Sequence, residues 1–161
     1  MAVDLYLKLD GVPGECIDSK HKEWIQLLSF SHAMNQAGSM FSGGGQSTSG
    51  RVDVADVSVM KRVDKATPKL SWHLATGQHI KSGIVEFCQS SKEKHVFMKY
   101  TFEDIVVSSL SPSVSHGGDF PVESLSYRFS KIEWEYTPID EKGGKQPSVK
   151  AWWDVKENKG A

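Results

Sequence analysis

The sequence has few of the features that mark membrane, disulfide-rich or nucleic-acid-binding proteins. No apolar run approaches the roughly 20 residues that a transmembrane helix needs. Only two cysteines are present, and we expect Cys16 and Cys88 to be buried thiols, with one disulfide as the alternative. With 19 basic and 20 acidic residues the formal net charge is −1, so no positive field attracts nucleic acid or an acidic membrane.

The first residues also lack the features of an export signal. The segment from Met1 to Lys8 has no basic region, apolar core or small-residue cleavage site. We therefore expect no Sec-dependent export and take synthesis in the cytoplasm as the starting assumption. The length of 161 residues, 39% of them hydrophobic, predicts one domain that spans residues 1–161 and has its own core.

Motifs for nucleotide, metal or nucleophilic chemistry are missing as well. Arg51 and Val52 stand where a P-loop requires Lys and Ser/Thr, and a strand is predicted after them instead of a helix. None of the six histidines forms HExxH or a ligand pair four residues apart, so each is expected to be structural. No GxSxG occurs. We predict no enzymatic activity, no cofactor and no metal ion.

One pair of carboxylates remains as a candidate for acid–base chemistry. Glu133 and Glu135 are two residues apart on a predicted strand, with Trp134 and Tyr136 on its other face. This arrangement favours a solvated strand face. An enzyme that combines the two carboxylates with a distant histidine stays as a third hypothesis.

Alternation of apolar and polar residues is the dominant pattern of the chain. It predicts strands over residues 3–9, 24–32, 52–59, 84–89, 96–102, 105–110, 122–136 and 149–155. Slips of one residue in the apolar set predict β-bulges near Ala55 and Asp56 and within residues 122–136. Many short strands with a single helix indicate a mainly β fold, either a barrel or a sandwich.

The one predicted helix begins at Thr67 and Pro68. The Thr67 side chain is expected to cap the first free N–H groups, and proline suits the first helical position. Leu70 and Leu74 lie four residues apart and should face the core. Gly77 is expected to end the helix in the left-handed conformation.

A Gly- and Ser-rich segment, residues 38–50, reads GSMFSGGGQSTSG. It has too few apolar side chains to form a core, so we expect an extended loop that is mobile unless a partner orders it. The predicted strands also leave open edges, which need a partner, a cover or charges. Together with the missing catalytic motifs, these features indicate a subunit that assembles with copies of itself.

Several segments, in their order and spacing, resemble the haemolysin-coregulated protein family, the inner-tube subunit of type VI secretion. The resemblance covers the chain from its first residue to about Asn158. Its segments are Met1 to Glu15, Gly38-Ser39-Met40 with the glycines that follow, Gly50 to Val54, Asp64 to Leu70, Val106 to Ser109, and Glu123 to Tyr136.

The resemblance implies a two-sheet β-barrel with one short helix beside it. It also implies homo-hexameric rings that stack into a tube, a contractile sheath around the tube and a spike protein at its tip. The subunit would be assembled in the cytoplasm, secreted without an N-terminal signal peptide, and act as a carrier of small effector proteins. We expect no toxin domain after Val155. The alternative function is a monomeric β-barrel that binds a peptide or small ligand.

The resemblance also assigns roles to particular residues. Ser29 and Ser31 correspond to the region that lines the lumen and contacts effectors, and Leu28 and Phe30 would then face the core. An inert, solvated strand face is the alternative for the two serines. The loop that would contact an adjacent ring or subunit contains Ser39, Met40, Phe41, Gly43, Gly44 and Gly45.

Overall fold

A computed structural model describes residues 2–38 and 49–161 of the chain. The helix is α1 (Thr67–Thr76). The strands are β1 (Val3–Leu9), β2 (Ile25–Ser31), β3 (Met34–Gly38), β4 (Ser49–Val54), β5 (Val57–Arg62), β6 (Ile80–Gln89), β7 (Val96–Ser113), β8 (Val122–Arg128), β9 (Lys131–Tyr136), β10 (Val149–Asp154) and β11 (Lys159–Gly160).

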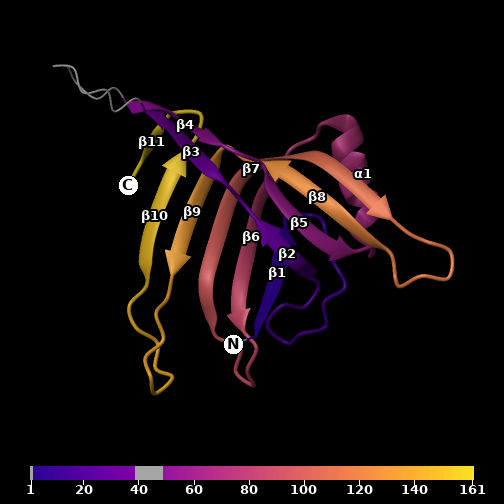
Figure 1. Ribbon diagram of the computed structural model, residues 1–161, viewed down its shortest axis with the longest axis horizontal. Helices are drawn as coiled ribbons and strands as arrows, with labels where there is room; N and C mark the ends of the chain where they lie inside the picture. The colour runs from indigo at the N-terminus through magenta and orange to yellow at the C-terminus, as the bar shows by residue number, and fades with distance from the viewer. Residues whose placement is uncertain (1, 39–48) are drawn as a thin grey trace.

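Six antiparallel strands close into a barrel. Their order is β7-β6-β1-β2-β5-β8, and the pairing of β8 with β7 completes the ring of hydrogen bonds (Figure 1). Strands β9, β10 and β11 extend the same sheet from the other edge of β7 as a wing. The mainly β barrel with one short helix is therefore confirmed.

Strand β7 belongs to both the barrel and the wing. Its first half pairs with β9 and its second half pairs with β8. The sequence predicts two strands here, but the chain continues as one strand through Asp104, whose φ is 56°. Because that residue adopts a left-handed conformation, the strand changes direction without ending.

Alternate residues of the barrel strands form the core. Leu7, Ile25, Phe102 and Leu125 are fully buried. The Phe102 ring lies 5.4 Å from the ring of Tyr127 at an angle of 83°, the edge-to-face arrangement that aromatic pairs favour. Each large apolar side chain buried in this way contributes roughly 1.5–3 kcal/mol.

The helix begins at Thr67 and ends before Gly77, as expected, but its N-terminal cap differs from the prediction. Gly77 has φ 71°, and its N–H donates to the carbonyl oxygen of His73 at 2.9 Å. Leu70 is fully buried and Leu74 packs against the core. The expected cap at Thr67 is wrong, because the cap residue is Ala66 and Thr67 is already helical. Among the described residues, no helix is both long and apolar enough to cross a bilayer.

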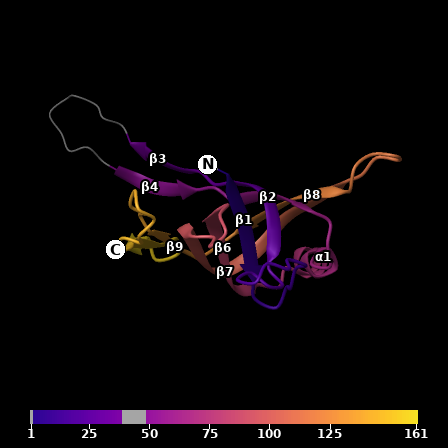
Figure 2. The ribbon, with the colours of Figure 1, turned by 90° about the horizontal axis from the view of Figure 1, so that it is seen from below.

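The two expected β-bulges are breaks between strands. Strand β4 ends at Val54 and pairs with β3 in a separate two-stranded sheet, whereas β5 begins at Val57 inside the barrel. Residues 122–136 likewise form β8 and β9, which meet different halves of β7. In Figure 2 the β3–β4 sheet projects from one side of the barrel, and the tip over residues 114–121 projects from the other.

Candidate functional site

The outward side of β2, β5, β8 and β7 is lined by serines. Val57, Val59, Leu125 and Tyr127 point into the core, so the residues between them face outward. Strand register then aligns these outward residues across the four strands. The serine face, as we call it, consists of Ser29, Ser31, Ser58, Ser109, Ser111, Ser124 and Ser126.

Two rows make up the serine face. In the first, Ser31 pairs with Ser58, Ser58 with Ser126, and Ser126 with Ser109. The hydroxyl oxygens of Ser58 and Ser126 are 3.1 Å apart. The second row runs in the same way from Ser29 through Met60, Ser124 and Ser111. The face therefore presents short neutral hydroxyl groups over much of one side of the barrel.

The structure places both predicted lumen residues on this face, where Ser29 and Ser31 are exposed. Phe30 is half-buried and packs against the core, as expected. The expected core position of Leu28 is wrong, because its exposed fraction is 52%. The pairing of β2 with β5 is irregular between Leu27 and Ser29, and the extra residue turns Leu28 outward.

The predicted ring-contact loop cannot be placed in the same way. Its residues Ser39, Met40, Phe41, Gly43, Gly44 and Gly45 lie outside the described residues. Strand β3 precedes that segment and β4 follows it. The two strands pair with each other, with Met34 opposite Val54 and Gly38 opposite Ser49.

An open cleft of about 610 Å³ lies near Leu28. Its apolar lining includes Ile17, Leu28 and Phe120, whose exposed fractions are 95%, 52% and 62%. Arg62 and Glu15 add charge to the rim. Exposed apolar side chains grouped around a cleft are typical of a protein-binding surface.

A buried ion pair joins β5, β8 and the start of α1. Lys61 and Glu123 are both fully buried and contact each other through Nζ and Oε1. Lys61 Nζ also donates to Asp64 Oδ1 at 2.9 Å, and the Thr67 hydroxyl donates to Glu123 at 2.7 Å. This network is structural, and no periodicity in the sequence indicates it.

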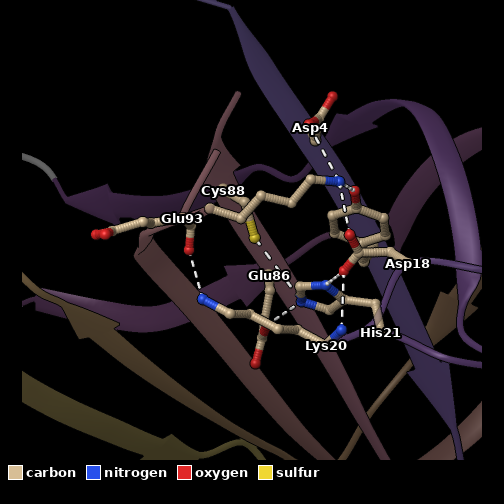
Figure 3. Close-up of polar contacts among 9 residues, drawn as sticks. Asp4, Asp18, Lys20, His21, Glu86, Cys88 and Glu93 are labelled. Carbon is tan, nitrogen blue, oxygen red and sulfur yellow. Dashed lines mark hydrogen bonds and ion pairs between the residues drawn. The ribbon is translucent and has the colours of Figure 1, made fainter. Parts of the chain in front are cut away.

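A second polar cluster surrounds His21, in the segment between β1 and β2 (Figure 3). The imidazole is 1% exposed; its Nδ1 lies 2.8 Å from Asp18 Oδ1 and its Nε2 lies 2.6 Å from Glu86 Oε2. The Cys88 sulfur lies 3.8 Å from Nε2. Hydrogen bonds from Lys94 and His21 lower the pKa of Asp18 to about 2.

Both cysteines are free thiols, as expected, but the expectation that both are buried is wrong for Cys16. Cys88 is buried and Cys16 is half-buried. Burial, with Glu86 nearby, raises the pKa of the Cys88 thiol to about 12. This cluster was not predicted from the sequence, because His21 is 65 residues from Glu86. The spacing Glu86-x-Cys88, which puts two donors on one face of a strand, is the only signal that could have indicated it.

The carboxylate pair does not form a catalytic arrangement. Glu133 and Glu135 are half-buried on β9, and Glu135 Oε2 lies 3.8 Å from Lys150 Nζ. Across residues 2–38 and 49–161, no histidine hydrogen-bonds either carboxylate. The pair thus fits a strand face that is partly open to water.

Comparison with known proteins gives a consistent picture. Residues 6–136 match the family described as type VI secretion system effector, Hcp. The chain is 34% identical over 160 residues to protein hcp1 of Pseudomonas aeruginosa, covering 98% of each chain. A solved structure titled as a type six secretion system protein superposes with a TM-score of 0.94 at 33% identity, over 99% of this chain and 100% of that one.

Hcp1 from Salmonella typhimurium is a further structural relative. It superposes with a TM-score of 0.82 at 34% identity, and all of both chains is covered. The family match covers most of the barrel, and the curated relative agrees over nearly the whole length. The chain therefore belongs to the Hcp family of type VI secretion tube proteins.

Proposed function

We propose that six copies of this chain close into a ring whose lumen is lined by the serine face, and that such rings stack into a type VI secretion tube. A head-to-tail contact repeated by rotation closes when its angle divides a full turn, so one interface type suffices. The exposed apolar residues around Ile17 and Phe120 supply surface for that contact.

The observation that carries this proposal is the two-row register of the serine face. Hydroxyl groups donate and accept hydrogen bonds without adding charge or bulk. A wall of such groups leaves room for a folded protein and holds it by many weak contacts. Small effector proteins are therefore the proposed cargo, with Ser29 and Ser31 in contact with them.

The remaining partners follow from the family. We infer that a contractile sheath surrounds the tube and that a spike protein covers its tip. The chain is then made in the cytoplasm and secreted with the tube itself, without an N-terminal signal peptide. Nucleic acid is not among the proposed partners, since the net charge of −1 offers no attraction to phosphate.

Particle mass and shape test the ring. Light scattering on the purified protein should give about six times the 17.9 kDa of one chain, and negative-stain images should show rings with a central hole. A mass of one chain at every concentration would contradict the ring. That result would favour a monomeric binding module that uses the cleft near Leu28.

Co-purification tests the cargo role. Replacing Ser31 with the bulkier Gln should lower the amount of effector retained, whereas ring mass stays unchanged. Ser91, an exposed serine outside the serine face, supplies the matched control Ser91→Gln, which should retain cargo as the wild type does. Equal retention of effector by both variants would show that the serine face is not the cargo site. That result would not argue against ring formation.

A further inference from the structure

Three donor atoms of different chemistry converge beside β6. The His21 nitrogen, one Glu86 oxygen and the Cys88 sulfur all lie within 4.8 Å of one another. Glu86 and Cys88 are two residues apart on β6, so their side chains leave the strand on the same face. Figure 3 shows the Cys88 sulfur and the Glu86 carboxylate approaching the same edge of the imidazole ring.

The imidazole ring is held in place before any ligand arrives. Its Nδ1 is hydrogen-bonded to Asp18, and Asp18 is itself paired with Lys94 at 2.9 Å. The ring stacks on Tyr6 at 4.0 Å with an interplanar angle of 6°, and Trp24 packs against it edge-on. In metal-binding histidines, the nitrogen that does not bind the metal usually donates its N–H to a carboxylate. Here Asp18 is hydrogen-bonded to Nδ1, so the Nε2 lone pair points toward Glu86 and Cys88.

The distance of 2.6 Å between His21 Nε2 and Glu86 Oε2 is that of a hydrogen bond, so the two atoms share a proton when no metal ion is bound. With Nδ1–H donating to Asp18, Nε2 of the neutral ring is an acceptor, and so is the ionised carboxylate. The proton of this hydrogen bond occupies the place that a metal ion would take, and the ion would hold the two atoms farther apart. A proton bridges only these two atoms, whereas a metal ion would also coordinate the Cys88 sulfur, which lies 3.8 Å from Nε2.

We propose that His21, Glu86 and Cys88 bind one divalent transition-metal ion, with Zn²⁺ as the preferred occupant. Mixed nitrogen, oxygen and sulfur ligands suit zinc and disfavour magnesium or calcium, which take oxygen ligands. Three protein ligands leave the fourth tetrahedral position to water. The inference is independent of the proposed ring and tube.

The measured distances require only a small adjustment. Tetrahedral zinc separates its nitrogen and sulfur ligands by about 3.6 Å, close to the 3.8 Å between His21 Nε2 and Cys88 Sγ. It separates nitrogen and oxygen ligands by about 3.3 Å, so the Glu86 oxygen must move outward by about 0.7 Å. The Glu86 side chain is 15% exposed and lines an open cleft of about 340 Å³, which gives it room to move.

Charge and proton balance are consistent with this occupant. Zinc coordinates the Cys88 thiolate, so the thiol proton and the proton shared by His21 Nε2 and Glu86 Oε2 both pass to solvent when the ion binds. A neutral imidazole, a carboxylate and a thiolate together carry two negative charges, which a divalent cation neutralises. A neutral complex is the form that a mostly buried site tolerates best.

Cobalt and zinc binding to the purified full-length protein test the site. After treatment with a chelator and dialysis, addition of cobalt chloride should produce the ultraviolet band of a thiolate–cobalt bond and the visible bands of tetrahedral cobalt, at one ion per chain. Zinc chloride should abolish both bands and raise the Tm. Absence of the thiolate band in the wild type would overturn the proposal.

Variants separate the site from unspecific binding. Cys88→Ser should lose the thiolate band and bind zinc at least 100-fold more weakly. Cys16→Ser removes the other free thiol, which is not among the three ligands, and should keep both properties. Asp18→Asn should weaken zinc binding about 10- to 100-fold through the imidazole.

Glu86→Gln keeps the size of the side chain and provides a second ligand variant if Cys88→Ser unfolds. Circular dichroism checks that each variant is folded before titration. Equal zinc affinity in Glu86→Gln and the wild type, or loss of the thiolate band in Cys16→Ser alone, would overturn the assignment of the ligands.

Discussion

The Asp104 carboxylate accepts a hydrogen bond from Lys156 Nζ at 2.8 Å, across 52 residues of chain. The same carboxylate accepts a hydrogen bond from the Ser130 hydroxyl at 2.6 Å and contacts His79 Nδ1. It therefore connects β7 to the start of β6, to the turn before β9 and to the segment after β10. One side chain holds the base of the wing against the barrel.

These contacts predict an acid-sensitive contribution to stability. Hydrogen bonds from Lys156, Ser130 and His79 hold the pKa of Asp104 well below its usual range. A lowered pKa stabilises the fold at pH values above the ordinary aspartate range, and this contribution is lost as the pH falls below about 4. Asp104→Asn, which tolerates the same backbone conformation, should therefore be destabilised at pH 7 and approach the wild type at low pH.

Urea unfolding at several pH values measures this effect. The loss at pH 7 should be about 1–2 kcal/mol, since water screens part of the interaction. Asp119→Asn, at an exposed position, is the control and should follow the wild-type pH profile. A constant difference between Asp104→Asn and the wild type at all pH values would contradict the prediction.

Replacing one member of the buried Lys61–Glu123 pair should lower the free energy of unfolding. Lys61→Met leaves the fully buried Glu123 with only the Thr67 hydroxyl as a donor, and Glu123→Leu leaves the fully buried Lys61 with Asp64 as its carboxylate partner. We expect each single change to lower the free energy of unfolding by about 3–5 kcal/mol. The double variant Lys61→Met/Glu123→Leu removes both charges and should lose less than the sum of the two single changes. Urea unfolding measures all three, and strict additivity would argue against the coupling.

Two glycines should differ in their tolerance of alanine. A Cβ at Gly77 meets no atom within 4 Å, so only the left-handed backbone opposes Gly77→Ala, at about 1–2 kcal/mol. A Cβ at Gly14 would lie 2.5 Å from the backbone oxygen of Trp24. Gly14→Ala should therefore lower the free energy of unfolding by about 3 kcal/mol or more, as measured by thermal or urea unfolding. The reverse order would show that the segment between β1 and β2 adapts easily.

The tip over residues 114–121 should contribute to contact between copies. Phe120 is 62% exposed beside the cleft, so Phe120→Ser removes little from the core of one subunit. We expect a lower particle mass by light scattering at a given concentration, with the free energy of unfolding of the isolated subunit changed by less than about 0.5 kcal/mol. An unchanged mass at all concentrations would place the contact elsewhere.

Local patterns predicted much of the fold. Alternation predicted β1, in which Leu7 and Leu9 are buried and Lys8 between them is exposed. Pro68 and Gly77 bounded the helix. Other features depend on contacts that are distant in sequence. The irregular pairing with β5 exposes Leu28, and a hydrogen bond to Glu123 engages the Thr67 hydroxyl. Neither effect is visible in the residues nearby.

Part of the candidate site could likewise be predicted from local sequence, and part depends on contacts between distant residues. Ser29 and Ser31 could be named because family resemblance pointed to one strand, but the serine face needed the register of three more strands. His21 lies in a segment without periodicity, so nothing local connected it to Glu86 and Cys88. Only closure of the sheet between β1 and β6 brings them together.

The pairing of β7 with strands of both the barrel and the wing has a mechanical consequence. Because it pairs with β6, β8 and β9, a force pulling on the wing acts along a strand that is also bonded within the barrel. The wing is therefore connected to the barrel through β7 and through the contacts of Asp104. In a tube that is pushed as a column, such a shared strand would spread load through each subunit instead of concentrating it at a hinge.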